Sequence, residues 1–426
     1  MAPDLRNAEP AGQVRQLVDE VGMSGPAANT LSDWKFYRHS LPETWQRHNM
    51  TDALRTMAEW AVARLPDTLR EGMTRGGLIF LGRTGLRKTP VVLYRGPTRG
   101  SGQSGVLLVA GHEPWVGYIP QRFFQGVPAR EPVGEYPLST LPHVLDQFQA
   151  RADLVVARVD RQSAQRGFGY HYLRVPEWMG TRLSVPDDLE KLVRSGSSIK
   201  RDMTLVRRYQ YQPVVTQGAQ DCDRFFHSIY VPFTQNRHGN LTFLRSEQDL
   251  KRRATRGGIL WVQRNGMHVA AILYERKNTI LDLVALGTVN GNINLEREGA
   301  ISALYYFILQ YACQGGYTVL DFRGCRPSLC DGLLRYKRKW GVTLYDKTDS
   351  YYDLLVRWDQ KNAVVREFLS HTPLIFRDAG GFSALGSDPH IARDLWVDGL
   401  QGCYDLRDWE FQPMDAHNHI IPALRV

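Results

Sequence analysis

The stretch "LDFRGCRPSLCDGLLRYKRKWG", Leu320 to Gly341, combines an apolar strand pattern, a loop rich in Gly, Cys and Pro, and a basic helical pattern. Residues at positions i, i+3, i+4 and i+7 share one face of a helix. Four residues have this spacing: Leu333, Tyr336, Lys337 and Trp340. The sequence therefore predicts a strand, a loop and a helix that closes on Gly341, with one lysine on its apolar face.

Lys337 is the cation of interest, because Arg335, Arg338 and Lys339 lie off this stripe and are expected to form a solvated basic flank. A lysine on an apolar face extends its charge to the surface, loses its proton or meets an anion. Burying an unpaired ammonium is costly, so we expect Lys337 to point inward and to face Asp321 or a substrate anion.

Composition gives a broad class for the chain. Its 426 residues are many for one core, so two or more domains are expected. A hydrophobic fraction of 43% and an aromatic fraction of 11% predict a globular protein with a substantial core. Lys and Arg number 53 against 44 Asp and Glu, and this net charge of +9 favours polyanionic or phosphorylated partners, although it also serves solubility.

Cysteine content and the N-terminal sequence bear on location. The five cysteines are an odd number at low density, so no disulfide framework is expected. The N-terminal "MAPDLRNAEPAGQ" lacks the apolar core of a signal peptide, and no apolar run approaches a membrane span. We expect a reduced, soluble, cytoplasmic protein.

Periodicity predicts alternating helices and strands. In the first half we expect a helix at 52–65, strands at 76–85 and within 89–112 broken by Gly-rich turns, and a helix followed by a buried strand at 142–160. In the second half the expected elements are a basic helical region at 186–216, an irregularly ending helix at 223–237, three strands at 257–286, and a long helix and strand at 297–322.

Three stretches resemble the Fem family of aminoacyltransferases and related acyltransferases of the GNAT superfamily. The first is "SSIKRDMTLVRRYQYQPV" at 197–214, and the second is "GGILWVQRNGMHVAAILYERKNTILDLVALG" at 257–287. The third is the opening stretch, whose Tyr336, Lys337, Trp340 and Gly341 are similar to the family's aromatic-Lys-x-x-aromatic-Gly signature. The resemblance covers residues 185–345 well and the N-terminal half only in outline.

The resemblance implies an α/β (α+β) fold with two GNAT-like domains, each a mixed, mainly antiparallel sheet flanked by helices. We expect a lead-in at 1–50, a degenerate first domain at 51–185, a second domain with the signature motifs at 186–370, and an extension at 371–426. It also implies transfer of an acyl or aminoacyl group to an amine, without a metal or cofactor. In Fem proteins the donor is aminoacyl-tRNA and the acceptor is a peptidoglycan precursor or small peptide, whereas related proteins are assigned acyl-CoA donors.

One departure separates these donors. GNAT proteins that use CoA carry a pattern of Gln/Arg-x-x-Gly-x-Gly/Ala, in which main-chain N–H groups cradle a pyrophosphate. This chain has "NLEREGAIS", with Arg297 and Gly299 in place but without the two-glycine spacing. Glu296 and Glu298 add negative charge there. We therefore prefer aminoacyl-tRNA as the donor, keep acyl-CoA as the alternative, and retain Arg297 and Gly299 as candidate substrate-binding residues.

The candidate catalytic residues are Lys337, Asp321 and Arg323, at the expected split of the second sheet. An amine that attacks an ester must lose a proton, and the carbonyl oxygen must be stabilised. Asp321 is a candidate to accept that proton, to pair with Lys337 or to anchor the loop, and Arg323 is expected on the same face. Lys337 is a candidate to meet a phosphate or the oxyanion, with Tyr336 and Trp340 as substrate contacts.

A basic patch with interleaved aromatics is the candidate tRNA site. Cations beside Tyr209 and Tyr211 suit a phosphate backbone and unstacked bases, although most charge runs are solvated helix faces. The predicted tRNA-binding residues are Lys200, Arg201, Arg207, Arg208, Arg338 and Lys339, with Arg194 nearby. The basic run at 250–258 has the same ambiguity, and a non-catalytic RNA-binding GNAT relative stays a third interpretation.

Other reactive residues have simpler interpretations. Asp415, His417 and His419 are expected in a loop rather than at a metal. Cys325 and Cys330 lie near the predicted site, where a transient thioester is conceivable, but buried small residues are the preferred interpretation.

Overall fold

The computed structural model describes residues 76–411, with gaps at 78, 80–81, 84, 86–87, 113–114, 170, 240–243, 348, 387–393 and 410. The chain divides into two compact units, 1–78 and 79–426, and the architecture below belongs to the second. The predicted lead-in at 1–50, the helix at 52–65 and the loop with His417 and His419 lie outside the described residues. In the described part of the chain, no helix is both long and apolar enough to cross a membrane.

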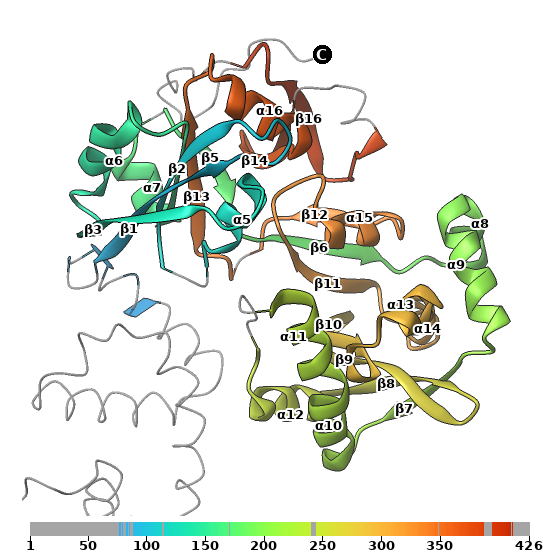
Figure 1. The fold of residues 1–426 in the computed structure, drawn as a ribbon. Coiled ribbons are helices and arrows are strands. Elements are labelled where there is room, and N and C mark those ends of the chain that lie inside the picture. The colour runs from blue at the N-terminus through green and yellow to red at the C-terminus, as the bar shows by residue number, and fades with distance from the viewer. Residues whose placement is uncertain are drawn as a thin grey trace, which may run out of the picture. The chain divides into compact units, whose positions relative to one another are not determined.

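The first sheet has six strands in the order β3-β1-β2-β4-β13-β5. Figure 1 labels β1, β2, β3, β5 and β13 of this sheet. Its strands are β1 (Thr89–Pro97), β2 (Ser104–Ala110), β3 (Ala129–Tyr136), β4 (Leu154–Asp160), β5 (Leu173–Pro176) and β13 (Tyr352–Trp358). Neighbouring strands are antiparallel except β2 and β4. The hairpin of β1 and β2 confirms the strands predicted within 89–112, and β4 confirms the buried strand predicted before residue 160.

Helices pack on both faces of this sheet. They are α5 (Tyr118–Phe123), α6 (Leu141–Gln149), α7 (Arg161–Gly167) and α16 (Ala363–His371). Because successive side chains of a strand point to opposite faces, Leu154 and Val156 of β4 pack with α5 and α16. Val155 and Ala157 pack with α6 and α7 on the other face.

The stretch at 76–85 differs from its prediction as a strand. Of its described residues, Gly76, Gly77, Ile79, Gly82 and Arg83 are helical and Gly85 lies in a turn. Its apolar run is short, and periodicity does not separate a buried strand from a helical segment in so short a run. The strand prediction was wrong for these residues.

The second sheet has seven strands in the order β12-β6-β11-β10-β9-β8-β7. Its strands are β6 (Met179–Ser184), β7 (Gln212–Thr216), β8 (Gly257–Arg264), β9 (Met267–Lys277), β10 (Ile280–Thr288), β11 (Val319–Cys325) and β12 (Thr343–Tyr345). Only β10 and β11 are parallel. The three strands predicted at 257–286 are confirmed, with Asn265 and Asn278 at positive φ in the two turns.

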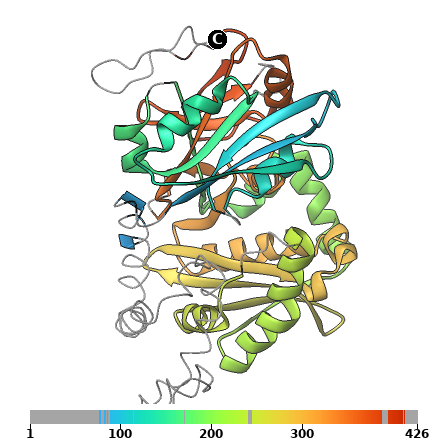
Figure 2. The same ribbon diagram turned by 60° about the vertical axis from the view of Figure 1, so that its left-hand side comes forward.

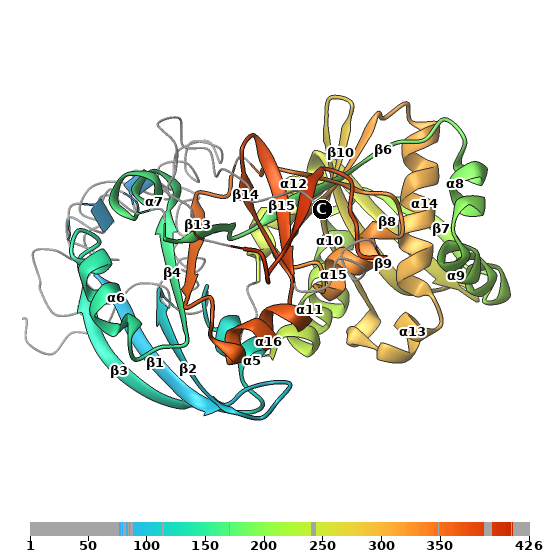
Figure 3. The ribbon, with the colours of Figure 1, turned by 90° about the horizontal axis from the view of Figure 1, so that it is seen from above.

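The second sheet also has helices on both faces. They are α8 (Leu189–Ser195), α9 (Ser197–Arg208), α10 (Ala219–Phe225), the π-turn η3 (Phe226–Tyr230), α11 (Val231–His238), α12 (Glu247–Thr255), the 3₁₀ turn η5 (Val289–Gly291), α13 (Ile293–Arg297), α14 (Ala300–Gln314) and α15 (Gly332–Arg338). α14 packs with α9 on one face, and α10 to α12 cover the other (Figures 2 and 3). The helix predicted at 223–237 is interrupted internally by η3.

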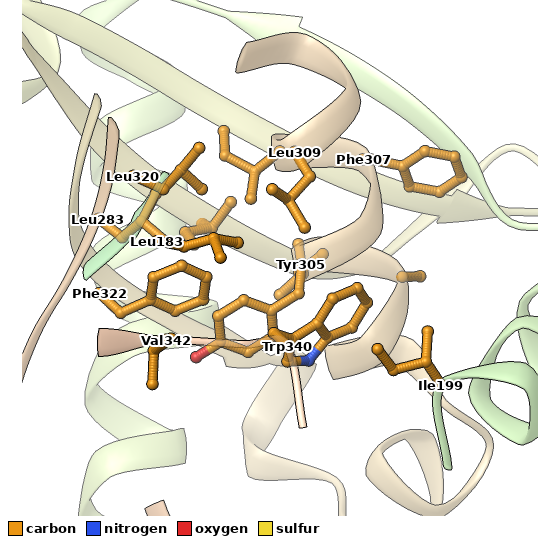
Figure 4. Packing of buried hydrophobic residues seen from close by; sticks show 14 of the residues in the cluster. Leu183, Ile199, Leu283, Tyr305, Phe307, Leu309, Leu320, Phe322, Trp340 and Val342 are labelled. Carbon is orange, nitrogen blue, oxygen red and sulfur yellow. The ribbon is translucent and has the colours of Figure 1, made fainter. Parts of the chain in front are cut away.

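The core on the α14 face is aromatic where α15 joins it (Figure 4). Tyr305 of α14 stacks on Phe322 of β11 with ring centroids 5.1 Å apart, and its centroid lies 5.9 Å from that of Trp340. Trp340 is fully buried in this core. Burying a large side chain contributes about 1.5–3 kcal/mol, so these rings fix α15 against β11.

A small third sheet completes the described unit, in the order β14-β15-β16. Its strands are β14 (Leu374–Asp378), β15 (Gly381–Gly386) and β16 (Leu400–Asp405). The two larger sheets are mixed, mainly antiparallel and flanked by helices, which confirms the predicted α/β (α+β) fold class. The domain boundaries stay predictions: β6 precedes the boundary at 185 yet belongs to the second sheet, and β13 follows it yet belongs to the first.

Candidate functional site

The parallel strands β10 and β11 separate soon after they meet. They pair over Ile280–Asp282 and Val319–Asp321, and beyond Asp282 β10 pairs only with β9. Beyond Asp321, the register of β11 against β6 shifts, and pairing resumes at Gly324. Main-chain groups of β10 that point toward β11 after this divergence therefore have no strand partner, as expected for the predicted split of the sheet.

Helix α15 is positioned by its two ends. The Asp331 carboxylate accepts a hydrogen bond from the Leu334 N–H at 3.1 Å, which satisfies a free donor at the helix start. Gly341, with φ of 80°, allows the left-handed turn that closes the segment. Leu334 is buried, but Leu333 is 45% exposed, so Leu333 is not part of the inward face that its spacing predicted.

Lys337 points inward and is 2% exposed. Its Nζ donates to the main-chain oxygens of Phe322 at 2.6 Å, Gly324 at 2.9 Å and Arg323 at 3.3 Å. It also donates to Thr181 Oγ1 at 3.1 Å. Lys337 thus holds the irregular segment of β11, where the register shifts and Arg323 adopts a φ of 59°.

Of the two partners expected for Lys337, Asp321 or a substrate anion, Asp321 does not form an ion pair with it. Leu320 and Phe322 are buried on the α14 side of β11, so Asp321 between them points to the opposite face. Burial lowers the pKa of Lys337 to about 8, although nearby carboxylates oppose this change. The main-chain oxygens that surround Nζ favour its charged form and occupy the place expected for Asp321, and a contact of Lys337 with a substrate anion stays a prediction.

Asp321 and Arg323 lie at the point of divergence with separate partners. Asp321 accepts hydrogen bonds from the Arg323 main-chain N–H and the Tyr345 hydroxyl, both at 2.7 Å. The Arg323 guanidinium binds both oxygens of Asp282, at 2.6 and 2.7 Å. Lys277 Nζ donates to the same Asp282 carboxylate at 2.6 Å. Asp321 therefore anchors the bulge while remaining partly exposed.

Tyr336 and Lys339 belong to a polar chain that joins three helices. The Tyr336 hydroxyl lies 2.9 Å from Ser302 Oγ, which donates to Asp202 at 2.8 Å. Lys339 also donates to Asp202, and its Nζ lies 3.8 Å from the Tyr336 ring centroid. Arg338 donates to the Asp394 main-chain oxygen at 2.6 Å. Lys339 and Arg338 were predicted to lie in a solvated basic flank of the helix. Both instead bind protein groups, so neither is fully solvated.

The turn before α14 places Arg297 on the surface and Gly299 in the interior. Gly299 has a φ of 89°, and a Cβ there would lie 3.0 Å from Leu205, so glycine suits this position. Glu296 pairs with Arg237 at 3.2 Å, and Glu298 pairs with Arg264 at 2.6 Å. The negative charge expected to repel a phosphate here is therefore offset by arginines.

The predicted basic patch forms an exposed surface of α9. Lys200, Arg201, Arg207 and Arg208 are all exposed, and within the described residues none of them forms an ion pair. Ile199, Met203 and Val206 bury the other side of the helix. The rings of Tyr209 and Tyr211 stack beside the patch with centroids 5.9 Å apart.

The other basic run is neutralised. Arg253 of α12 binds Asp249 at 3.1 Å and Glu275 at 2.7 Å, and Arg256 binds Glu275 at 2.6 Å. The two basic runs therefore differ. Carboxylates neutralise the arginines of the second run, whereas the exposed cations of α9 form no ion pair within the described residues and can bind an outside partner.

A groove of about 890 Å³ adjoins the patch. Arg207 and Tyr211 line it together with Tyr306 and Phe307 of α14 and Asn265 of the β8–β9 turn. It thus combines a cation, aromatic rings and an amide beside the exposed surface of α9.

The cysteines are all unpaired, as predicted. Burial raises the pKa of Cys325 to about 12, which opposes a thiolate nucleophile at this position. Within the described residues, one group has the spacing of metal ligands: Asp223, His227 and Glu247, whose ligand atoms lie within 4.8 Å of one another. Asp223 and His227 are exposed on α10 and η3, and within the described residues this group shares no hydrogen bond or ion pair with Lys337 or Asp321.

The sequence did not identify the partners that surround the predicted residues. Thr181 comes from β6, a strand that was not predicted, and Tyr345 follows the signature in β12. Asp282 lies in the predicted strand "ILDLVAL", where a charge within an apolar run was an available signal. Asp202 lies in the basic stretch that the resemblance covers.

No family model and no curated protein match the chain. Among solved structures, it is similar to L-PGS from Bacillus licheniformis, with 12% identity, coverage of 62% of this chain and 81% of that chain, and a TM-score of 0.32. It is similar to FemX at 12% identity, with coverage of 64% and 89% and a TM-score of 0.33. A GCN5-related N-acetyltransferase from Kribbella flavida matches at 13% identity, with coverage of 66% and 93% and a TM-score of 0.24.

Proposed function

We propose that this chain is a transferase that forms an amide bond between an acyl or aminoacyl group and an amine, at the divergence of β10 and β11. The observation that carries the proposal is the edge of β10 that faces β11 beyond Asp282, which has no partner strand among the described residues. Unpaired main-chain N–H groups on such an edge are donors for a carbonyl oxygen that gains negative charge.

The residues around this edge suit transfer chemistry. Lys337 fixes the opposing bulge of β11 from within the core. Asp321 is partly exposed at the point of divergence, where its carboxylate is available to accept a proton from an attacking amine. Arg323 and Tyr345 hold this carboxylate in place. These assignments of role to Lys337, Asp321 and Arg323 are part of the proposal.

Aminoacyl-tRNA is the proposed donor, and the exposed cations of α9 support it. Phosphate contacts need unneutralised cations, and the partly exposed ring of Tyr209 suits an unpaired base, whereas Tyr211 is buried beneath it. The acceptor is proposed to be the amine of a small peptide or of a cell-wall-precursor-like molecule, and the site of action is the cytoplasm, where aminoacyl-tRNA is found.

Acyl-CoA is the second candidate donor because of the turn before α14. There Arg237 and Arg264 offset the charges of Glu296 and Glu298, and Arg297 is exposed. A phosphate at this turn would meet less repulsion than the sequence alone suggests.

A two-donor assay tests the proposal. The purified protein is incubated with a panel of small amines and dipeptides and with either a mixed pool of aminoacyl-tRNAs or acyl-CoAs, and amide products are measured by mass spectrometry. We expect products with aminoacyl-tRNA. Products with acyl-CoA alone would favour the second donor, and tRNA binding without any product would indicate a non-catalytic RNA-binding protein.

A further inference from the structure

Arg326 follows β11 directly and has an unusual environment. Its guanidinium carbon lies 3.8 Å from the ring centroid of Tyr118 and 3.9 Å from that of Trp178. Two rings cannot occupy one face of a guanidinium at these distances, so one ring lies on each side. Cation–π contact stabilises such a sandwich and leaves the edge of the guanidinium, with its N–H groups, for other partners.

The Arg326 guanidinium has no hydrogen-bond partner within the described residues, and its Nη1 is buried. Among the described residues, the two carboxylates that act electrostatically on Arg326, Glu177 and Asp331, are already held by other arginines. Arg158 binds Glu177 through two hydrogen bonds, at 2.7 and 3.1 Å. Arg122 binds Asp331 at 3.1 Å. Within the part of the chain that the structure describes, Arg326 is therefore a surplus positive charge in a partly buried place, where an unpaired cation is costly.

The loop that carries Arg326 is fixed in place. The Leu329 N–H donates to the Pro373 main-chain oxygen, and the Ile375 N–H donates to that of Pro327, both at 3.0 Å. Arg326 itself, Tyr118 and Trp178 are each partly exposed, so a ligand can approach the group. A cation held in position before binding loses little conformational freedom when a ligand arrives.

The sandwich adjoins the divergence of β10 and β11. A Cβ at Gly324 would lie 3.2 Å from the Trp178 ring, so this ring rests on the bulge whose oxygens Lys337 holds. Arg326 thus extends from the carboxyl end of β11, where ligands bind in open α/β sheets.

We propose that Arg326, between Tyr118 and Trp178, binds an oxyanion of the acceptor, either a carboxylate or a phosphate group. A planar guanidinium matches both groups through two parallel hydrogen bonds. The identity of the bound molecule as the acceptor rests on the proposed function, whereas the anion site itself does not.

Calorimetry without any donor tests the site with two matched pairs of amines. Glycylglycine is compared with glycylglycinamide, and phosphoethanolamine with ethanolamine, so that each pair differs in its anionic group. We expect the anionic member of one pair to bind about tenfold to hundredfold more tightly, as charged hydrogen bonds require. The pair that shows the preference identifies a carboxylate or a phosphate.

Arg326→Gln should abolish this preference, whereas Arg335→Gln, which removes an exposed cation of α15, should retain it. Arg326→Lys keeps the charge without the planar fork and should lose most of the preference, which provides a second variant if Arg326→Gln does not fold in a melting experiment. A wild-type protein without preference, or a preference that survives folded variants of Arg326, would overturn the proposal. Because no donor is present, absence of turnover bears on the proposed function alone.

Discussion

The buried ammonium of Lys337 has a structural role, because it donates hydrogen bonds to the backbone of β11. Three consecutive carbonyl oxygens, of residues 322–324, turn toward Nζ because β11 bulges between Asp321 and Gly324. A bulge leaves main-chain groups outside the sheet ladder, and these groups need partners when they are buried. Lys337 supplies three hydrogen-bond donors at this place, so a structural contribution accompanies any role in transfer.

Lys337→Met should destabilise the fold by roughly 2–4 kcal/mol, because buried acceptors left without donors cost about 1–3 kcal/mol each and removal of a buried charge offsets part of the loss. Urea denaturation monitored by circular dichroism measures the change. Arg335→Met, on the exposed side of the same helix, is the matched control and should stay within about 0.5 kcal/mol of wild type. Equal stability of the two variants would show that the carbonyl oxygens do not depend on Lys337.

Asp282 gives the site a dependence on acid pH. Burial favours its neutral form, but Arg323 and Lys277 outweigh burial and lower its pKa below the usual 3.8. A lowered carboxylate pKa contributes stability above the unfolded value, and this stability is lost as pH falls below it.

The difference in unfolding free energy between wild type and Asp282→Asn should therefore be largest near neutral pH and shrink below about pH 4. Urea denaturation at about pH 6, 4 and 3 gives the profile, with the exposed Asp187→Asn as control. A difference that does not change with pH would mean that the carboxylate charge is not what Arg323 and Lys277 stabilise.

At the level of elements, α9 and α12 show that two basic runs of similar composition have different surroundings. α12 packs its arginines against Asp249 and Glu275, so these cations stabilise the fold locally. α9 has Asp202 as its only acidic residue, and this carboxylate is directed toward Lys339 of the α15 segment. The remaining cations of α9 are thereby left to solvent or to a polyanion.

Arg207→Glu combined with Arg208→Glu should weaken tRNA binding at least tenfold at low salt. It should also reduce the salt dependence of binding, because fewer phosphate contacts form and fewer counterions are therefore released from the tRNA. Filter binding over a range of salt concentrations measures both quantities. Arg166→Glu combined with Lys361→Glu changes the net charge equally at exposed positions of α7 and the β13–α16 turn, and it is the control. Equal loss in both double variants would attribute binding to overall charge rather than to α9.

For the whole molecule, local patterns predicted elements better than their assembly. Turn residues at Asn265 and Asn278 and the apolar α14 identified the order of elements in the second sheet. The two sheets exchange strands across the predicted boundary at 185: β6 belongs to the second sheet and β13 to the first. This strand exchange was not predictable, because nothing in the sequence of β13 specifies a partner nearly two hundred residues earlier. For the same reason the inward direction of Lys337 was predicted, but its partners were not. They depend on the bulge, on Thr181 of β6 and on the positive φ of Arg323.

The strand exchange predicts that residues 1–185, the predicted lead-in and first domain together, will not fold alone. β13 lies between β4 and β5 and pairs with β4 over its whole length, from Tyr352 to Trp358. Without it, both neighbouring strands would present unpaired main-chain groups and an apolar surface to water, as unprotected sheet edges do. The buried Asp353 of β13 also accepts a hydrogen bond from Arg174 of β5, at 2.9 Å.

Near-ultraviolet circular dichroism and urea titration of the 1–185 fragment should show no cooperative transition, and co-expression with residues 346–411 should restore one, because that segment supplies β13 together with α16. Co-expression with residues 186–345, which contain neither element, is the control and should not restore it. A cooperative transition of the 1–185 fragment alone would show that the first sheet closes without β13, and the boundary at 185 would then separate two independent folding units.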